Sequence, residues 1–137
     1  MIRIPWKRTK HKRDVFKLPM TDFVRDLLLK IGTYSEGGYV FPANSGSGHI
    51  SEPKYPLGLV AKATDIEVSI HDLRRDYTTA AENTDMSAFA LKALVDHTLP
   101  GNEGDVTAGY INMTVARLRE PAQRVANLLK LWCGLEN

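Results

Sequence analysis

Five residues spread along the chain have side chains suited to handling a phosphate group: Lys10, His71, Arg74, His97 and Tyr110. An arginine presents a planar fork that matches two non-bridging phosphate oxygens, which a lysine cannot imitate. A histidine can donate a hydrogen bond to a phosphate oxygen or relay a proton. A tyrosine hydroxyl can attack phosphorus and form a covalent intermediate, provided that nearby cations stabilise the charge that develops. Together these residue types would permit phosphoryl transfer without a metal ion.

Taken singly, these residues also have plainer interpretations. A histidine such as His71 more often caps a helix or lies on its surface. His97 would serve equally as a helix-end cation that offsets the helix dipole, and Tyr110 as a half-buried core aromatic. Local spacing joins only His71 and Arg74, because residues three apart share one face of a helix.

Other kinds of site have little support in the sequence. The four histidines and the one cysteine show no metal-ligand spacing, and no Gly-x-Ser-x-Gly elbow of a serine hydrolase is present. The glycine-rich segment 44–53 resembles neither a Walker loop nor a dinucleotide fingerprint, so we expect a plain loop with an exposed His49. Cys133 cannot form an internal disulfide, and we expect a small apolar residue of the last helix there rather than a nucleophile.

The composition is that of an ordinary globular protein. The chain has 137 residues, of which 43% are hydrophobic and 25% charged, enough for one domain with a modest core. No apolar run approaches the roughly 18–20 residues that span a bilayer. The N-terminus lacks the apolar segment of a secretory signal, and a single cysteine fits a reducing cytoplasm.

The distribution of charge is more informative than the net charge, which is only +2. Residues 1–13 contain no acid, and their cations are Arg3, Lys7, Arg8, Lys10, Lys12 and Arg13. Such a block suits a polyanion such as a phosphate backbone. A solvated, frayed basic terminus explains it equally well.

Two short strands and a helix are predicted near the N-terminus. The apolar and β-branched runs 2–5 and 14–19 are typical of strands, and the basic segment between them is typical of a hairpin loop. Thr21 is a good N-cap for a helix over 22–31 that Gly32 ends. Its apolar face comprises Phe23, Val24, Leu27, Leu28 and Ile31. Residues 39–43 should form a short strand or an extended piece.

Helices dominate the rest of the chain. A brief helix over 57–64 should follow Pro56. Ser69 and Asp72 form a Ser-x-x-Asp start for a helix that runs to about Asn83. A further helix is predicted over 87–97, with an apolar stripe of Phe89, Leu91, Leu94 and Val95.

The C-terminal part is predicted to hold a turn, a short helix and a long one. The turn covers 99–105, and the short helix begins at 106. Pro121 marks the start of the last helix, which ends at Gly134. One face of that helix carries Val125, Leu128, Leu129 and Trp132. We therefore expect a mainly α chain with a small antiparallel β-sheet at its N-terminal edge, an α+β fold.

The order of these motifs resembles a known family. "HDLRRDYTTAA", then "LKALVDHTLPG", then "DVTAGYI" is similar to the C-terminal catalytic half of tyrosine recombinases, particularly phage and genomic-island integrases. That family pairs His-x-x-Arg on a helix with a later Leu-Gly-His and a nucleophilic tyrosine. It also carries a lysine in a hairpin turn, and "RTKHKRDVFKLPMT" has this layout with Lys10 as the best match, although Lys7 and Lys12 are close by.

The resemblance implies a role for each matched residue. Tyr110 would attack the scissile phosphodiester, giving a 3′-phosphotyrosine and a free 5′-hydroxyl. Arg74 would clamp the phosphate, Lys10 would protonate the leaving oxygen, and His71 and His97 would hydrogen-bond the phosphate. Further DNA contacts are expected from Arg8, Lys12, Arg13 and Arg75.

The resemblance also implies the fold and the partners. Residues 1–137 would be part of a DNA breaking-rejoining catalytic domain, with a β-hairpin over 1–19 and helices over 20–137. The partners would be double-stranded DNA and other recombinase protomers assembled on it, with no membrane, cofactor or metal. An uncovered sheet edge would favour self-association.

Two departures from the family pattern matter. Asp96 stands where the family has glycine, and an acid near a phosphate weakens binding unless it points away. No segment resembles the family's Thr-Gly-x-Arg-x-Gly-Glu, which carries a second arginine, nor is there an N-terminal DNA-clamping domain. The sequence therefore looks like a fragment, and we expect little recombinase activity from it alone. The alternatives are a non-catalytic DNA-binding remnant of an integrase and a plain helical domain with a solvated basic tail.

Overall fold

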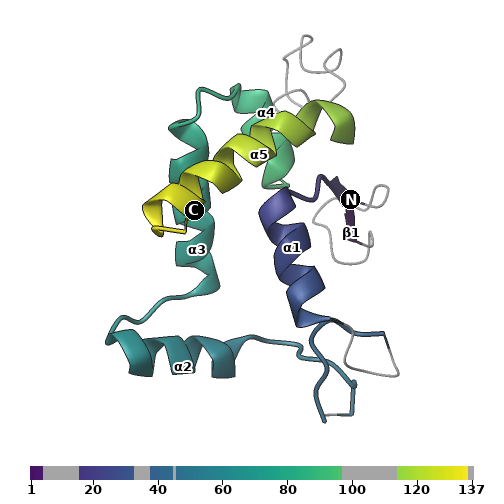
Figure 1. The fold of residues 1–137 in the computed structure, drawn as a ribbon, viewed down its shortest axis with the longest axis vertical. Helices are drawn as coiled ribbons and strands as arrows, with labels where there is room; N and C mark the ends of the chain where they lie inside the picture. Colours follow the sequence, from purple (N-terminus) through teal and green to yellow (C-terminus); the bar gives the residue numbers. More distant parts are fainter. Residues whose placement is uncertain (5–15, 33–37, 45, 97–113, 136–137) are drawn as a thin grey trace, which may run out of the picture. The chain divides into compact units, whose positions relative to one another are not determined.

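In the computed structural model, residues 1–4, 16–32, 38–44, 46–96 and 114–135 are described. They form two short strands and five helices (Figure 1). In chain order these are β1 (Ile2–Ile4), β2 (Phe16–Leu18), α1 (Asp22–Ile31), α2 (Lys54–Thr64), α3 (Ile70–Glu82), α4 (Ala88–Leu94) and α5 (Val115–Trp132). The described chain is thus mainly helical with a small antiparallel sheet, as the sequence predicts.

The two strands pair as predicted. β1 runs antiparallel to β2, with Ile2 opposite Leu18, Arg3 opposite Lys17 and Ile4 opposite Phe16. Because successive side chains of a strand point to opposite faces, the apolar residues share one face and are half-buried, whereas Arg3 and Lys17 share the other face and are exposed. The connecting segment 5–15 lies outside the described residues.

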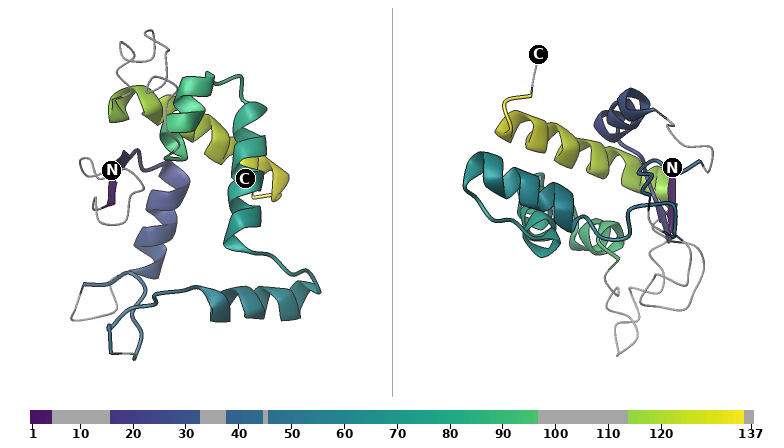
Figure 2. Two further views of the ribbon diagram at one scale, coloured as in Figure 1. Left: turned by 180° about the vertical axis from the view of Figure 1, so that it is seen from behind. Right: turned by 90° about the horizontal axis from the view of Figure 1, so that it is seen from below.

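The chain divides into two compact units, of which the first comprises Met1–Asp22 and Asp76–Asn137. Two clusters form its core. The first contains Ala90, Leu94, Leu118 and Ala122, and the second contains Ala80, Ala81 and Val125. Tyr77 and Met86 pack against both clusters, so they join them, and Leu18 of β2 packs against the first. α4 lies beside α5 in each view of the ribbon (Figures 1 and 2).

The helix α5 begins earlier than predicted. Thr114 is its N-cap, with a hydroxyl that accepts from the backbone N–H of Arg117 at 3.3 Å, so Pro121 lies inside the helix rather than at its start. A proline there removes the hydrogen bond to the carbonyl four residues earlier, and its ring crowds that carbonyl. Burial of Leu118, Ala122 and Val125 on one face explains why the helix continues despite this loss.

The end of α5 is confirmed. Gly134 has a φ of 64°, its N–H donates to the Leu131 carbonyl, and the N–H of Leu135 donates to the Lys130 carbonyl at 2.9 Å. These two hydrogen bonds form a Schellman motif. The motif requires a left-handed backbone conformation, which glycine adopts without strain. At this end Cys133 is the C-cap and is exposed, and Trp132 is 52% exposed.

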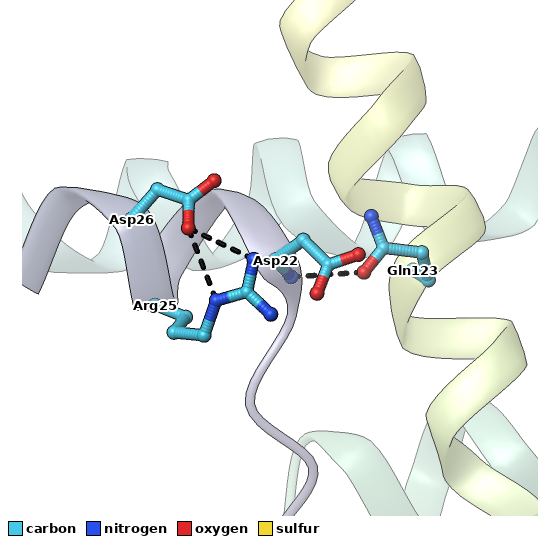
Figure 3. Close-up of polar contacts among 4 residues, drawn as sticks. All are labelled: Asp22, Arg25, Asp26 and Gln123. Carbon is cyan, nitrogen blue, oxygen red and sulfur yellow. Dashed lines mark hydrogen bonds and ion pairs between the residues drawn. The ribbon is translucent and has the colours of Figure 1, made fainter.

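A side chain of α5 also caps the start of α1. The backbone N–H of Asp22 donates to Oε1 of Gln123 at 3.0 Å, as Figure 3 shows. The first N–H groups of any helix lack partners within that helix. Gln123 therefore fixes the point at which the chain leaves β2 and enters α1.

The second unit, Phe23–Arg75, has no fully buried side chain among its described residues. α1 has the predicted bounds, and Gly32 follows it with a φ of 70°. Its predicted apolar face is only partly covered, since Phe23 and Leu27 are exposed. α2 begins at Lys54, before the predicted start, and Pro56 fits its first turn because no intrahelical bond is lost there.

A small hairpin precedes α2 in this second unit. Residues 39–43 form no continuous strand, because the chain bends at Val40 and Phe41, and Pro42 forms an isolated antiparallel bridge with His49. The His49 ring stacks on that of Tyr39 with a centroid distance of 4.8 Å, and its Nδ1 lies 2.8 Å from the Ser47 carbonyl oxygen. His49 is therefore half-buried within the hairpin, which corrects the expectation of an exposed side chain.

The helix α4 is shorter than predicted. Ser87 is its N-cap and accepts from the N–H of Ala90 at 3.2 Å, but the helix ends at Leu94 instead of reaching residue 97.

None of the helices in the described part of the chain combines the length and the apolar character needed to cross a membrane.

Candidate functional site

The site begins with the first turn of α3, where the predicted capping box is confirmed. The Ser69 hydroxyl donates to Oδ2 of Asp72 at 2.6 Å and accepts from the Asp72 backbone N–H at 3.2 Å. The Ser69 backbone N–H donates to the same carboxylate oxygen at 3.0 Å. This reciprocal arrangement satisfies two N–H groups that a helix start otherwise leaves unpaired. The capping box therefore fixes the residue at which α3 begins, and His71 lies in its first turn.

Hydrogen bonds from Ser69 lower the pKa of the Asp72 carboxyl below its ordinary value of 3.8, and the nearby charges of Arg75 and His71 lower it further. Asp72 is thus a carboxylate at neutral pH. Its Oδ2 accepts both hydrogen bonds from Ser69, so this acid is engaged in capping the helix.

His71, Arg74 and Arg75 form the basic face of α3. All three side chains are exposed. On a helix, residues three and four apart are neighbours, so His71 adjoins both Arg74 and Arg75. The structure therefore brings together the two predicted phosphate ligands of "HDLR" and one predicted DNA contact. This set offers two guanidinium forks beside an imidazole at a helix N-terminus, where an anion is favoured.

The buried face of α3 extends along the helix from its second half to its first turn, where it adjoins the basic face. Tyr77, Ala80 and Ala81 point into the core. One and two turns earlier, Leu73 is 48% and Ile70 is 55% exposed, on the same side as Arg74. Ile70 and Leu73 thus flank Arg74 on the exposed surface of α3.

Asp96 turns the backbone at the end of α4. The residue follows the C-cap Val95 of α4 and has a φ of 52°. Residues at this position commonly adopt the left-handed conformation, which glycine tolerates best and aspartate or asparagine next best. Asp96 therefore follows the end of α4 in a conformation that a glycine would adopt with less strain.

Several predicted site residues lie outside the described residues. These are Lys10, His97 and Tyr110 of the catalytic set and Arg8, Lys12 and Arg13 of the DNA contacts. Their positions relative to α3 stay predictions. Within the described segments, no three His, Cys, Asp or Glu side chains come together as a candidate metal site.

Sequence reasoning missed one charged pair. Arg3 and Lys17 lie directly opposite each other on β1 and β2. The signal for this pair is the strand register, because only pairing Ile2 with Leu18 places the two cations side by side. A count of charges along the chain does not reveal it.

Comparison with known proteins identifies no family. No model of a protein family matches the chain, and neither the curated proteins nor the solved structures give a significant match. The geometry of α3 and the order of the motifs therefore carry the functional argument by themselves.

Proposed function

We propose that this chain acts on a DNA phosphodiester in the manner of a tyrosine recombinase. Tyr110 attacks phosphorus and displaces the 5′-oxygen, forming a 3′-phosphotyrosine, and Lys10 gives the leaving oxygen its proton. His71 and Arg74 hold the non-bridging oxygens, together with His97. The reaction is an exchange of one phosphodiester for another, so it needs neither ATP nor a metal ion.

The single observation that carries this proposal is the exposed pair of His71 and Arg74 at the capped start of α3. Ser69 and Asp72 already cap the helix, so neither His71 nor Arg74 is needed for capping. The order of "HDLR", "LVDH" and "AGY" along the chain adds support.

Covalent capture on nicked duplex DNA tests the proposal. One substrate carries the ordinary 5′-oxygen at the scissile phosphate, and the other carries a bridging 5′-sulfur, which leaves as a thiolate without being protonated. We expect slow but measurable capture of the oxygen substrate and faster accumulation of a stable protein–DNA adduct with the sulfur substrate. Tyr110→Phe should abolish the adduct with both.

The sulfur substrate also identifies the general acid. Loss of a general acid costs roughly 10²–10⁴-fold in rate, so Lys10→Ala should slow capture of the oxygen substrate and leave capture of the sulfur substrate unchanged. Lys7→Ala and Lys12→Ala are the matched controls. The general acid is the lysine whose replacement slows capture of the oxygen substrate but not capture of the sulfur substrate.

The opposite results would favour the alternative. A chain that binds duplex DNA yet forms no adduct with either substrate is a non-catalytic DNA-binding module. An adduct that persists in Tyr110→Phe would refute the assignment of the nucleophile.

A further inference from the structure

The paired cations of the two-stranded sheet have no structural explanation. Arg3 of β1 and Lys17 of β2 lie directly opposite each other, and both are exposed. Like charges in directly opposed positions destabilise a sheet. Among the described residues, neither side chain forms an ion pair. The pair therefore costs stability in the free protein, and an anionic partner would relieve the repulsion.

Packing fixes the direction in which the two cations point. Leu18 lies on the opposite face of the sheet and packs against the cluster of Ala90, Leu94, Leu118 and Ala122. Because side chains alternate along a strand, Lys17 must then face away from this core, and Arg3 with it. A slip of β2 by one residue would turn Lys17 toward the core and Leu18 away from it, so the apolar face fixes this arrangement as well as the register.

We propose that Arg3 and Lys17 form a contact for the phosphate backbone of double-stranded DNA. The choice of partner rests on the proposed function, and charge complementarity supports it: two adjacent cations match the closely spaced charges of a duplex. The contact positions the two-stranded sheet on the duplex and does not read bases.

The salt dependence of DNA binding tests this contact. The full chain is titrated with two duplexes of unrelated sequence over a range of salt concentrations, in a Tyr110→Phe background so that no cleavage contributes. Each neutralised phosphate contact contributes about 0.9 to the slope of log affinity against log salt. We expect Arg3→Gln and Lys17→Gln each to reduce the slope by about 0.9, equally on both duplexes.

Matched variants separate this role from a structural one. Lys17→Arg keeps the charge and should keep the slope, and Lys62→Gln removes an exposed cation of α2 and should leave it unchanged. Without DNA, Lys17→Gln should melt at the same temperature or higher, because it relieves the repulsion by Arg3. Lower melting temperatures in both glutamine variants, together with unchanged slopes, would show a structural role and overturn the proposal.

Two further outcomes would also overturn it. A loss confined to one of the duplexes would indicate base recognition, and a larger effect on single-stranded RNA would assign the contact to another nucleic acid. These results are independent of the covalent capture assay. Covalent capture by the wild-type chain, together with wild-type salt slopes in both glutamine variants, would support the proposed function and refute this contact. Reduced slopes in a chain that shows no capture would support the contact and refute the proposed function.

Discussion

Ser69 and Asp72 exchange hydrogen bonds at the start of α3, the hydroxyl donating to the carboxylate at 2.6 Å and accepting from the Asp72 N–H at 3.2 Å. His71 lies between these two residues in the sequence, and Arg74 follows one turn after Ile70. The capping box therefore determines where the helix begins and, with it, which face carries the imidazole and the guanidinium. Several consequences of this and other contacts can be measured.

Acid should loosen the first turn of α3. The pKa of Asp72 is lower in the folded chain than its ordinary value of 3.8, so the contribution of this carboxylate to stability is present above pH 3.8 and is lost as the pH falls through the lower folded-state value. Thermal unfolding of the wild-type chain and of Asp72→Asn between pH 2 and 6 checks this. The two curves should converge at the acidic end. A constant difference across the range would contradict the prediction.

Replacing the other half of the box should weaken the helix at every pH. Ser69→Ala removes the hydroxyl that accepts from the Asp72 N–H, and the loss of such an N-cap costs about 1 kcal/mol. Denaturant unfolding gives this value, and Ser51→Ala, at an exposed position before α2, is the control. Equal losses in the two variants would show that the capping bond contributes nothing specific.

Arg74→Lys should reduce covalent capture although the charge is kept. A lysine cannot form the two parallel hydrogen bonds of a guanidinium fork, and loss of one transition-state donor typically costs 10²–10³-fold. The initial rate of adduct formation with the sulfur substrate is the measurement. Arg119→Lys, an exposed position on α5, is the matched control. Wild-type rates in Arg74→Lys would remove Arg74 from the site.

Asp96→Gly should be neutral or stabilising. The φ of 52° at Asp96 is strained for a residue with a Cβ atom and not for glycine. Asp96→Val should destabilise the chain by about 1–2 kcal/mol, because β-branched residues avoid this region most strongly. Asp85, with a φ of 51°, offers the matched pair Asp85→Gly and Asp85→Val. We expect both sites to respond alike in stability, with only Asp96→Gly raising covalent capture.

Alkali should destabilise the core through Tyr77. Burial raises the pKa of its hydroxyl above the ordinary value of 10.0, because the charged form loses hydration. The contribution of the neutral ring is therefore complete below pH 10 and is lost as the pH rises through the folded-state value. The fall in melting temperature above pH 10 should be smaller in Tyr77→Phe than in Tyr55→Phe, where the ring is 77% exposed. Identical falls would contradict this.

Much of the fold follows from local patterns. The apolar and β-branched runs 2–5 and 14–19 predict the two paired strands, and Ser69 with Asp72 predicts the start of α3. Proline misleads in two places, because Pro56 fits a first turn and Pro121 is tolerated inside a helix with a buried face. The predicted end of α4 was also wrong. The apolar stripe on which the prediction rests continues past Leu94, whereas the backbone turns at Asp96.

The candidate site was predictable only in part. The spacing of His71 and Arg74 is enough to place both on one helix face, and the structure agrees. The opposition of Arg3 and Lys17 depends on strand register, which the hydrophobic pattern sets over three residue pairs rather than within one segment. Whether Lys10, His97 and Tyr110 converge on Arg74 depends on long-range packing, and no local rule supplies it.

The small side chains of the core determine which changes the protein tolerates. Four of the seven buried hydrophobic residues in the described part of the chain are alanines, at positions 80, 81, 90 and 122. Helix spacing depends on the side chains at the contact, so these methyl groups hold α3, α4 and α5 close together. Truncation has little to remove there, whereas one added isopropyl group forces helices apart at roughly 1–3 kcal/mol. At these positions, substitutions that enlarge the side chain are therefore less well tolerated than substitutions that keep it small. A core built on leucine responds in the opposite way, because there truncation is the costly change.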